Sequence, residues 1–199
     1  NGVRVVATGR QPVASKELDG IIDQYIVCDL ADPKQVKSLP LDEVDAIINL
    51  AGLAIVGAGN NQEQYARSNI TTQTNIADRL LELGHNTRLL VISSGSVYDA
   101  EQPMPVNEYG RLAKNAMPYV LSKIQMEQQI LPYKDKGVDV IIVRPFNHIG
   151  PGQSKGFLLP DLVDRAVNQQ KLLVGPVSTS RDYTDVRDVV CAYRLLATR

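Results

Sequence analysis

Three residues in the middle of the chain have the types and spacing of a proton-transfer site. Tyr119 and Lys123 are four residues apart, so on a helix they share one face and can act on one bound molecule. Pro118 fits the first position of that helix. A free phenol has a pKa of about 10, and a neighbouring ammonium group and a helix N-terminus both stabilise its anion. We therefore expect the pKa of Tyr119 to be lowered towards neutrality.

Ser94 adds a hydroxyl group at the end of a predicted strand. The apolar run at residues 89–92 is typical of a buried strand, and Ser93 and Ser94 follow it directly. Ligands of parallel α/β sheets bind outside the carboxyl ends of the strands, where a hydroxyl can hold a substrate carbonyl. A tyrosine and a lysine at this spacing also occur on ordinary surface helices. The combination with the serine-rich strand end favours a catalytic centre of Ser94, Tyr119 and Lys123.

Composition restricts the classes of ligand. The 199 residues are 44% hydrophobic and 22% charged, which suits one soluble domain or a domain with part of another. The net charge is −1 with no basic block, so neither nucleic acid nor a membrane surface is expected as a partner. No run is apolar enough to span a bilayer and no leader opens the chain, which predicts a cytoplasmic protein. Without a Cys/His cluster we expect no metal, and Cys28 and Cys191 should be packed, reduced thiols.

The apolar periodicity predicts strands that alternate with helices, and hence a doubly wound parallel α/β sheet of the Rossmann type. The strands are expected at residues 3–8, 24–30, 46–52, 89–92, 139–143 and 171–175, and the helices at residues 62–83, from 118 to about 132–137, 160–170 and after 186. The apolar side chains of the 160–170 helix should face inward. The one G-x-G, at residues 57–59, lacks the third glycine of a phosphate-binding turn. We therefore expect the glycine-rich first βα unit to lie upstream of residue 1.

Two strand ends bear on the cofactor. An acid after the second strand of such folds binds the ribose 2′-hydroxyl of NAD, whereas an arginine accommodates the 2′-phosphate of NADP. Arg10 stands where the acid would be, which favours NADP, although a solvated loop arginine is the alternative. Asp29, at the end of the next strand, could contact the cofactor or cap the helix after Pro33.

Four motifs together resemble the extended short-chain dehydrogenase/reductase family of sugar-nucleotide epimerases, dehydratases and reductases. They are the Ser94, Tyr119 and Lys123 set, residues 49–54 (Asn-Leu-Ala-Gly-Leu-Ala), residues 144–152 (Arg-Pro-Phe-Asn-His-Ile-Gly-Pro-Gly) and residues 181–186 (Arg-Asp-Tyr-Thr-Asp-Val). The third motif is similar to that of the GDP-4-keto-6-deoxymannose reductase branch. The resemblance covers essentially all 199 residues and implies a family member truncated at both ends. It divides the chain into an NAD(P)-binding domain, residues 1–147, and part of a sugar-nucleotide-binding region, residues 148–199.

The resemblance also assigns residue roles. The residues that it places at the cofactor are Arg10, Asp29, Leu30, Leu50, Ala51, Gly52, Asn69, Ser93, Tyr119, Lys123 and Phe146. The residues that it places at the sugar nucleotide are Ser94, Asn147, Leu158 and Arg181. Arg181 would meet the diphosphate, a role that suits a guanidinium group. A homodimer formed through the helices at 62–84 and 118–137 is usual in the family.

The function that the resemblance implies is NADPH-dependent reduction of a nucleotide-linked 4-keto-6-deoxy sugar, with GDP as the expected nucleotide and NAD as a possible cofactor. An NAD-dependent nucleotide-sugar 4-epimerase is the first alternative, but Ala54 stands where UDP-galactose 4-epimerases carry a lysine. Dehydration is disfavoured because Gly95 and Ser96 follow Ser94, where the family's dehydratases carry acids. A non-catalytic dinucleotide sensor or scaffold is the alternative from another class.

Overall fold

The computed structural model describes residues 2–54, 61–168, 171, 174–175, 177–178 and 180–199. The strands are β1 (Val6–Gly9), β2 (Gln24–Val27), β3 (Ala46–Asn49), β4 (Arg88–Ile92), β5 (Val140–Val143), β6 (Asn147–Ile149) and β7 (Tyr183–Asp185). The α-helices are α1 (Pro33–Val36), α2 (Gln62–Tyr65), α3 (Thr72–Leu83), α4 (Pro118–Ile130), α5 (Pro132–Asp135), α6 (Leu158–Val167) and α7 (Val186–Thr198). A π-helical segment, Ala66–Thr71, joins α2 to α3, and short 3-10 turns occupy Lys16–Leu18 and Gly95–Val97.

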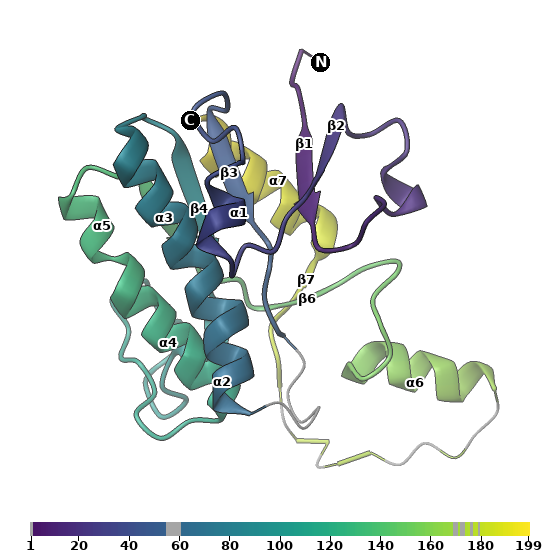
Figure 1. Cartoon of the computed structure of the whole chain (residues 1–199). Coiled ribbons are helices and arrows are strands. Elements are labelled where there is room, and N and C mark those ends of the chain that lie inside the picture. Colours follow the sequence, from purple (N-terminus) through teal and green to yellow (C-terminus); the bar gives the residue numbers. More distant parts are fainter. Residues whose placement is uncertain (1, 55–60, 169–170, 172–173, 176, 179) are drawn as a thin grey trace.

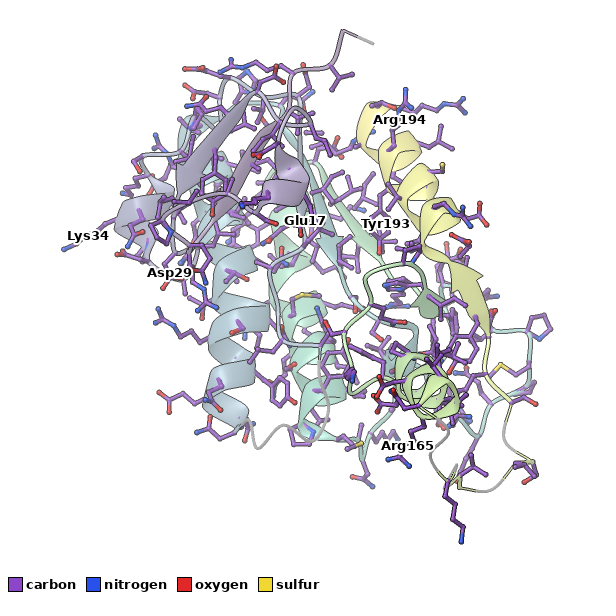
Figure 2. The ribbon with its side chains drawn as sticks, turned by 90° about the vertical axis from the view of Figure 1, so that its right-hand side faces the viewer. Glu17, Asp29, Lys34, Arg165, Tyr193 and Arg194 are labelled. Carbon is purple, nitrogen blue, oxygen red and sulfur yellow. The ribbon has the colours of Figure 1, made fainter. Side chains whose placement is uncertain are left out.

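The strands run parallel and helices cover both faces of the sheet. β3, β4 and β5 pair in that order, β1 pairs with β2, and β6 pairs with β7. Helices α3 and α4 lie in front of β4, and α7 lies behind it (Figure 1). Figure 2, a quarter turn away, shows α7 on the other side of the strands from α3 and α4. The predicted doubly wound parallel α/β fold is confirmed.

β4 is the centre of the packing. Leu89 and Val91 are fully buried in the cluster that also contains Ala77 of α3 and Met126 of α4. Leu90 points to the opposite face, because successive side chains of a strand alternate, and it is equally buried. α7 covers that face and is tied to β4 by the guanidinium group of Arg88, which donates a hydrogen bond of 3.0 Å to the carbonyl oxygen of Leu196. β4 is therefore packed on both faces, and its first residue is tied to α7.

The sheet is divided between β1 and β3. Within the described residues no strand pairing joins the β1–β2 pair to the β3–β4–β5 sheet. Val5, just before β1, and Ile48, in β3, are exposed although both are apolar. A further strand would fit at this division, where the predicted upstream glycine-rich unit would supply one. That unit, and the division into domains at residue 147, stay predictions.

Two predicted elements differ from those observed. The helix expected at 62–83 is present but contains the π-helical segment. Residues 147–149, for which no strand was expected, form a short strand, β6, because they pair with β7. Of the strand predicted at 171–175, residues 172–173 lie outside the described residues, and residues 171, 174 and 175 belong to no strand. The G-x-G at 57–59 also lies outside the described residues.

Two burial predictions are wrong. α6 has no buried residue, and Val167, predicted to face inward, is 74% exposed because no other part of the described chain covers that side of the helix. Cys28 is packed as predicted, but Cys191 lies on the exposed side of α7. None of the described helices is both long and apolar enough to cross a membrane. The described residues also contain no group of three or more His, Cys, Asp or Glu side chains that could hold a metal.

Candidate active site

Helix α4 places Tyr119 and Lys123 on one face at the end of β4. The helix begins with Pro118 at its first position, as predicted. Lys123 is only 7% exposed, and its ammonium group donates a hydrogen bond of 2.7 Å to the carbonyl oxygen of Ile92. An ammonium group has three N–H donors, so this contact fixes its position and leaves donors for a bound molecule.

Ser94 lies beside Tyr119. The hydroxyl oxygen of Ser94 accepts a hydrogen bond of 3.2 Å from the backbone N–H of Ser96, so its own proton is directed elsewhere. Ser94 lies close enough to the phenol of Tyr119 for a side-chain hydrogen bond between them to lower the pKa of Tyr119. The structure therefore brings the three predicted catalytic residues together at the carboxyl end of β4.

Burial shifts the pKa values of Tyr119 and Lys123 in opposite directions. It raises the pKa of Tyr119; the hydrogen bond from Ser94 lowers this pKa in part, and the neighbouring Tyr65 raises it further. Burial also lowers the pKa of Lys123 to about 8, against the carboxylate of Glu127, which favours the charged form. The expectation that the pKa of Tyr119 is lowered is thus wrong for this structure, because desolvation outweighs the ammonium group one turn away. Tyr119 is a neutral phenol at neutral pH and can donate a proton.

The loop after β3 approaches Lys123 closely. A Cβ atom on Gly52 would lie 3.7 Å from the ammonium nitrogen of Lys123 and 2.8 Å from the side-chain oxygen of Asn69. A residue with a side chain would therefore have to displace Asn69. Leu50 and Ala51, just before Gly52, are exposed, so this loop presents its surface to a ligand beside Lys123.

Asn69 holds that loop and is fully buried. Its side-chain oxygen accepts a hydrogen bond of 2.8 Å from the backbone N–H of Leu53, and its amide nitrogen donates one of 2.9 Å to the hydroxyl of Ser122. Ser122 in turn donates to the carbonyl oxygen of Tyr119. Asn69 lies on the π-helical segment, a distortion that often marks functional sites. The structure thus shows a positioning role for Asn69; the predicted contact with a cofactor stays a prediction.

Phe146 covers the other side of the serine segment. A Cβ atom on Gly95 would lie 2.8 Å from the ring of Phe146, so glycine is needed there. The same ring stacks on Tyr98, with centroids 6.2 Å apart and an interplanar angle of 12°. Phe146 remains partly exposed, next to Ser94.

Two buried polar atoms at the strand ends are unpaired. They are the amide nitrogen of Asn49, at the end of β3, and the hydroxyl of Ser93, at the end of β4. Buried polar groups in proteins are nearly always hydrogen-bonded to protein, water or ligand. Together with the glycine at position 52, these atoms fit a site for a polar cofactor at the carboxyl end of the sheet.

Asp29 and Leu30, which the resemblance places at the cofactor, make contacts of their own. The carboxylate of Asp29 lies 2.6 Å from the guanidinium group of Arg67, on the π-helical segment, and the carbonyl oxygen of Leu30 accepts a hydrogen bond from Asn75. Arg67 is thus a contact that the sequence did not single out. Arg10 follows β1 and is exposed.

The predicted substrate residues other than Ser94 are not brought together. Asn147, Leu158 and Arg181 are exposed, and Arg181 donates to the neighbouring carbonyl of Ser180. A cleft of about 570 Å³ lies near them and is lined by Ile149, Gly150, Gly152, Gln153, Lys155, Leu159, Pro160, Val163, Asp164, Val167 and Asp185. None of the three lines it, so their contacts with a sugar nucleotide stay predictions.

This arrangement of residues agrees with the comparison to known protein families. The model of the NAD dependent epimerase/dehydratase family matches residues 1–199. The chain belongs to this family. The resemblance to nucleotide-sugar-modifying enzymes is thereby confirmed.

Proteins to which the chain is similar include reductases and epimerases. GDP-6-deoxy-D-mannose reductase of Pseudomonas aeruginosa is 34% identical over 180 residues, which are 85% of this chain and 59% of that protein. UDP-glucose 4-epimerase of Erwinia amylovora is 27% identical over 191 residues, 88% of this chain and 56% of that protein. The structure of RMD from Pseudomonas aeruginosa complexed with NADPH is similar with a TM-score of 0.77 and 30% identity, covering 98% of this chain and 74% of that one. The chain thus spans less than two thirds of the length of these two sequence relatives.

Proposed function

We propose that the whole protein is an NADPH-dependent reductase that acts on a nucleotide-linked 4-keto-6-deoxy sugar, with GDP as the nucleotide. The observation that carries the proposal is the joint placement of Ser94, Tyr119 and Lys123 at the end of β4. Similarity to a GDP-6-deoxy-D-mannose reductase and to RMD bound to NADPH supports the choice of substrate and cofactor. The chemistry needs one proton donor, one hydride and a group that holds the carbonyl.

In this proposal each residue has one task. Ser94 donates a hydrogen bond to the sugar ketone, and Tyr119 gives its phenolic proton to the oxygen as the alkoxide forms. The ammonium group of Lys123 stabilises the resulting phenolate and holds the nicotinamide ribose. Residues 50–52, Ser93, Asn49 and Phe146 would hold the cofactor, which supplies the hydride when bound.

A 4-epimerase is the second candidate. Similarity to UDP-glucose 4-epimerase favours it, but Ala54 is not the lysine that such epimerases carry, by the resemblance described above. A non-catalytic dinucleotide sensor would not need Ser94, Tyr119 and Lys123 together at one strand end. The cytoplasmic location and the homodimer stay predictions.

The test is turnover by the whole protein. With GDP-4-keto-6-deoxymannose and NADPH we expect stoichiometric NADPH oxidation and formation of a GDP-6-deoxyhexose, detected by absorbance and mass spectrometry. Conversion of UDP-glucose to UDP-galactose without net NADPH use would show the epimerase instead. NADPH binding without turnover of either substrate would favour the sensor.

A further inference from the structure

Arg144, directly after β5, forms a partly buried ion pair with the catalytic helix. Its Nε and Nη2 atoms donate to the two carboxylate oxygens of Glu127, at 2.9 and 2.6 Å. The side chain of Glu127 is 6% exposed. Two parallel bonds of this kind fix both distance and orientation, because the guanidinium fork matches the carboxylate. Glu127 is one helical turn after Lys123, on the same face of α4.

The remaining Nη1 atom of Arg144 binds two other segments. It donates at 3.0 Å to the phenolic oxygen of Tyr98 and at 2.9 Å to the backbone carbonyl of Glu108. The guanidinium group also lies 4.9 Å from the centroid of the Tyr98 ring, which stacks on Phe146. Tyr98 follows the Ser94 segment, and Glu108 belongs to the long loop at residues 99–117.

The side chain of Arg144 thus connects the segments whose relative positions must be kept during catalysis. These are α4 with Tyr119 and Lys123, the Ser94 to Tyr98 segment, and the 99–117 loop beside them. Four N–H donations of Arg144 are used, and they go in three directions. A lysine could not reproduce this, because its ammonium group is a point charge without the planar fork.

We propose that Arg144 and Glu127 are a positioning pair that sets α4 against the Ser94 segment and holds the 99–117 loop beside the site. Neither side chain acts on substrate in this scheme. The catalytic consequence rests on the proposed reductase function, whereas the effect on the loop does not. The experiment therefore measures both.

The first measurement is proteolysis of the loop in the whole protein. Tyr109 is 94% exposed and lies one residue after Glu108, so chymotrypsin cleavage after Tyr109 reports release of the loop. Arg144→Lys and Arg144→Met should each accelerate this cleavage, on the order of tenfold or more, because local opening becomes more populated. Glu127→Gln keeps the shape of the side chain and should have a smaller effect of the same sign.

The second measurement is the kinetics of keto-sugar reduction. Arg144→Lys should lower kcat by a factor on the order of ten to a hundred, since small misplacements at a site have effects of this size. Its Kd for NADPH should stay within a factor of about three, because no cofactor-binding residue has changed. Arg88→Met is the matched control, since Arg88 makes a comparable 2.7 Å ion pair with Asp139 at the opposite end of β4. It should change neither the cleavage rate nor kcat.

The double variant Arg144→Met with Glu127→Met guards against loss of folding. It removes both partners and leaves no unpaired buried charge, so it should fold while still releasing the loop and lowering kcat. Wild-type cleavage rates in both Arg144→Lys and the double variant would overturn the proposal. So would a kcat unchanged in these variants despite a released loop. If the wild-type protein reduces no keto sugar, the proposed function fails, but the cleavage series still decides whether the pair holds the loop.

Discussion

At the scale of single residues, the proton donor follows from burial. Tyr119 keeps its proton because desolvation raises its pKa. Ser94 can donate a hydrogen bond that stabilises the phenolate formed once this proton has been transferred. Replacing Tyr119 by phenylalanine removes the donor and keeps the ring, which packs edge-on against Tyr65.

We predict that Tyr119→Phe lowers kcat for ketone reduction by a factor of about 10² to 10⁴, the usual contribution of a general acid. NADPH affinity should change little, because the ring and its contacts remain. Steady-state kinetics and a fluorescence titration of NADPH measure the two quantities. Tyr109→Phe, at an exposed position, is the control; full activity in Tyr119→Phe would contradict the role.

The lowered pKa of Lys123 gives a pH dependence. Its ammonium form predominates below a pKa of about 8 and is lost as the pH rises through that value. Glu127 is the one charged side chain that acts on it in the described structure, and it favours the ammonium form. We therefore expect kcat/KM to fall above about pH 8, and the fall to begin at lower pH in Glu127→Gln. A profile that stays flat to about pH 10 would show that the charge on Lys123 is not required.

Arg10 carries the prediction on cofactor choice. If it holds the 2′-phosphate, the whole protein prefers NADPH over NADH, and Arg10→Asp reduces that preference by about 1 to 3 kcal/mol, the range for hydrogen bonds to charged groups. Calorimetry with both cofactors measures the difference. Arg4→Asp, an exposed change just before the same strand, is the control. Equal affinity of the wild type for the two cofactors would remove the basis for the assignment.

At the scale of elements, the π-helical segment is the feature that connects cofactor loop and catalytic helix. It places Asn69 where one side chain can bind both Leu53 and Ser122. The sequence predicted the helix but not this distortion, because hydrophobic periodicity reports which face is buried and not a single extra residue in a turn.

We predict that Asn69→Ala destabilises the protein by about 1 to 3 kcal/mol, because it leaves the partly buried N–H of Leu53 and the buried hydroxyl of Ser122 short of a partner. Asn86→Ala, at an exposed position in the turn after α3, should cost less than about 0.5 kcal/mol. Urea unfolding followed by circular dichroism compares the two. Equal stability of both variants would mean that the Asn69 contacts contribute nothing.

An element could be predicted to the extent that its residues nearby in sequence determine its structure. β3, β4 and β5 are continuous apolar runs at the centre of the fold, and they were expected within a few residues of their observed bounds. β6 depends on a partner, β7, that lies far along the chain, and no local pattern contains that information. α6 is amphipathic, but its apolar side is uncovered, and periodicity cannot show what covers a face.

In the candidate site too, the residues defined by local sequence could be predicted and those defined by distant contacts could not. Ser94, Tyr119 and Lys123 could be read from residue type and spacing, because strand end and helix face determine where they lie. The pairing of Arg144 with Glu127 could not be predicted in this way, because the two residues are 17 positions apart. As charged residues, both would be equally compatible with exposure to solvent. Glu127 had one usable signal, its spacing of four from Lys123.

At the scale of the whole molecule, the divided sheet bears on cofactor binding. The sequence has no G-x-x-G-x-x-G turn, and within the described residues no strand joins β1 to β3. Such a turn, at the start of a helix, is what holds the pyrophosphate in dinucleotide folds, through backbone N–H groups and the helix dipole. The cofactor-binding residues that the resemblance assigns to this chain do not include that central contact.

We therefore predict that these 199 residues alone bind NADPH weakly, with a Kd of about 1 mM or above, which corresponds to about −4 kcal/mol. Isothermal titration calorimetry of the 199-residue chain gives the value, and adenosine 2′,5′-bisphosphate serves as a probe without the pyrophosphate. If the pyrophosphate contact is what is lacking, the bisphosphate and NADPH should bind with affinities within about tenfold of each other. Binding of NADPH at a micromolar Kd would show that residues 50–52 and the strand ends hold the phosphates by themselves. The division between β1 and β3 would then have no part in cofactor recognition.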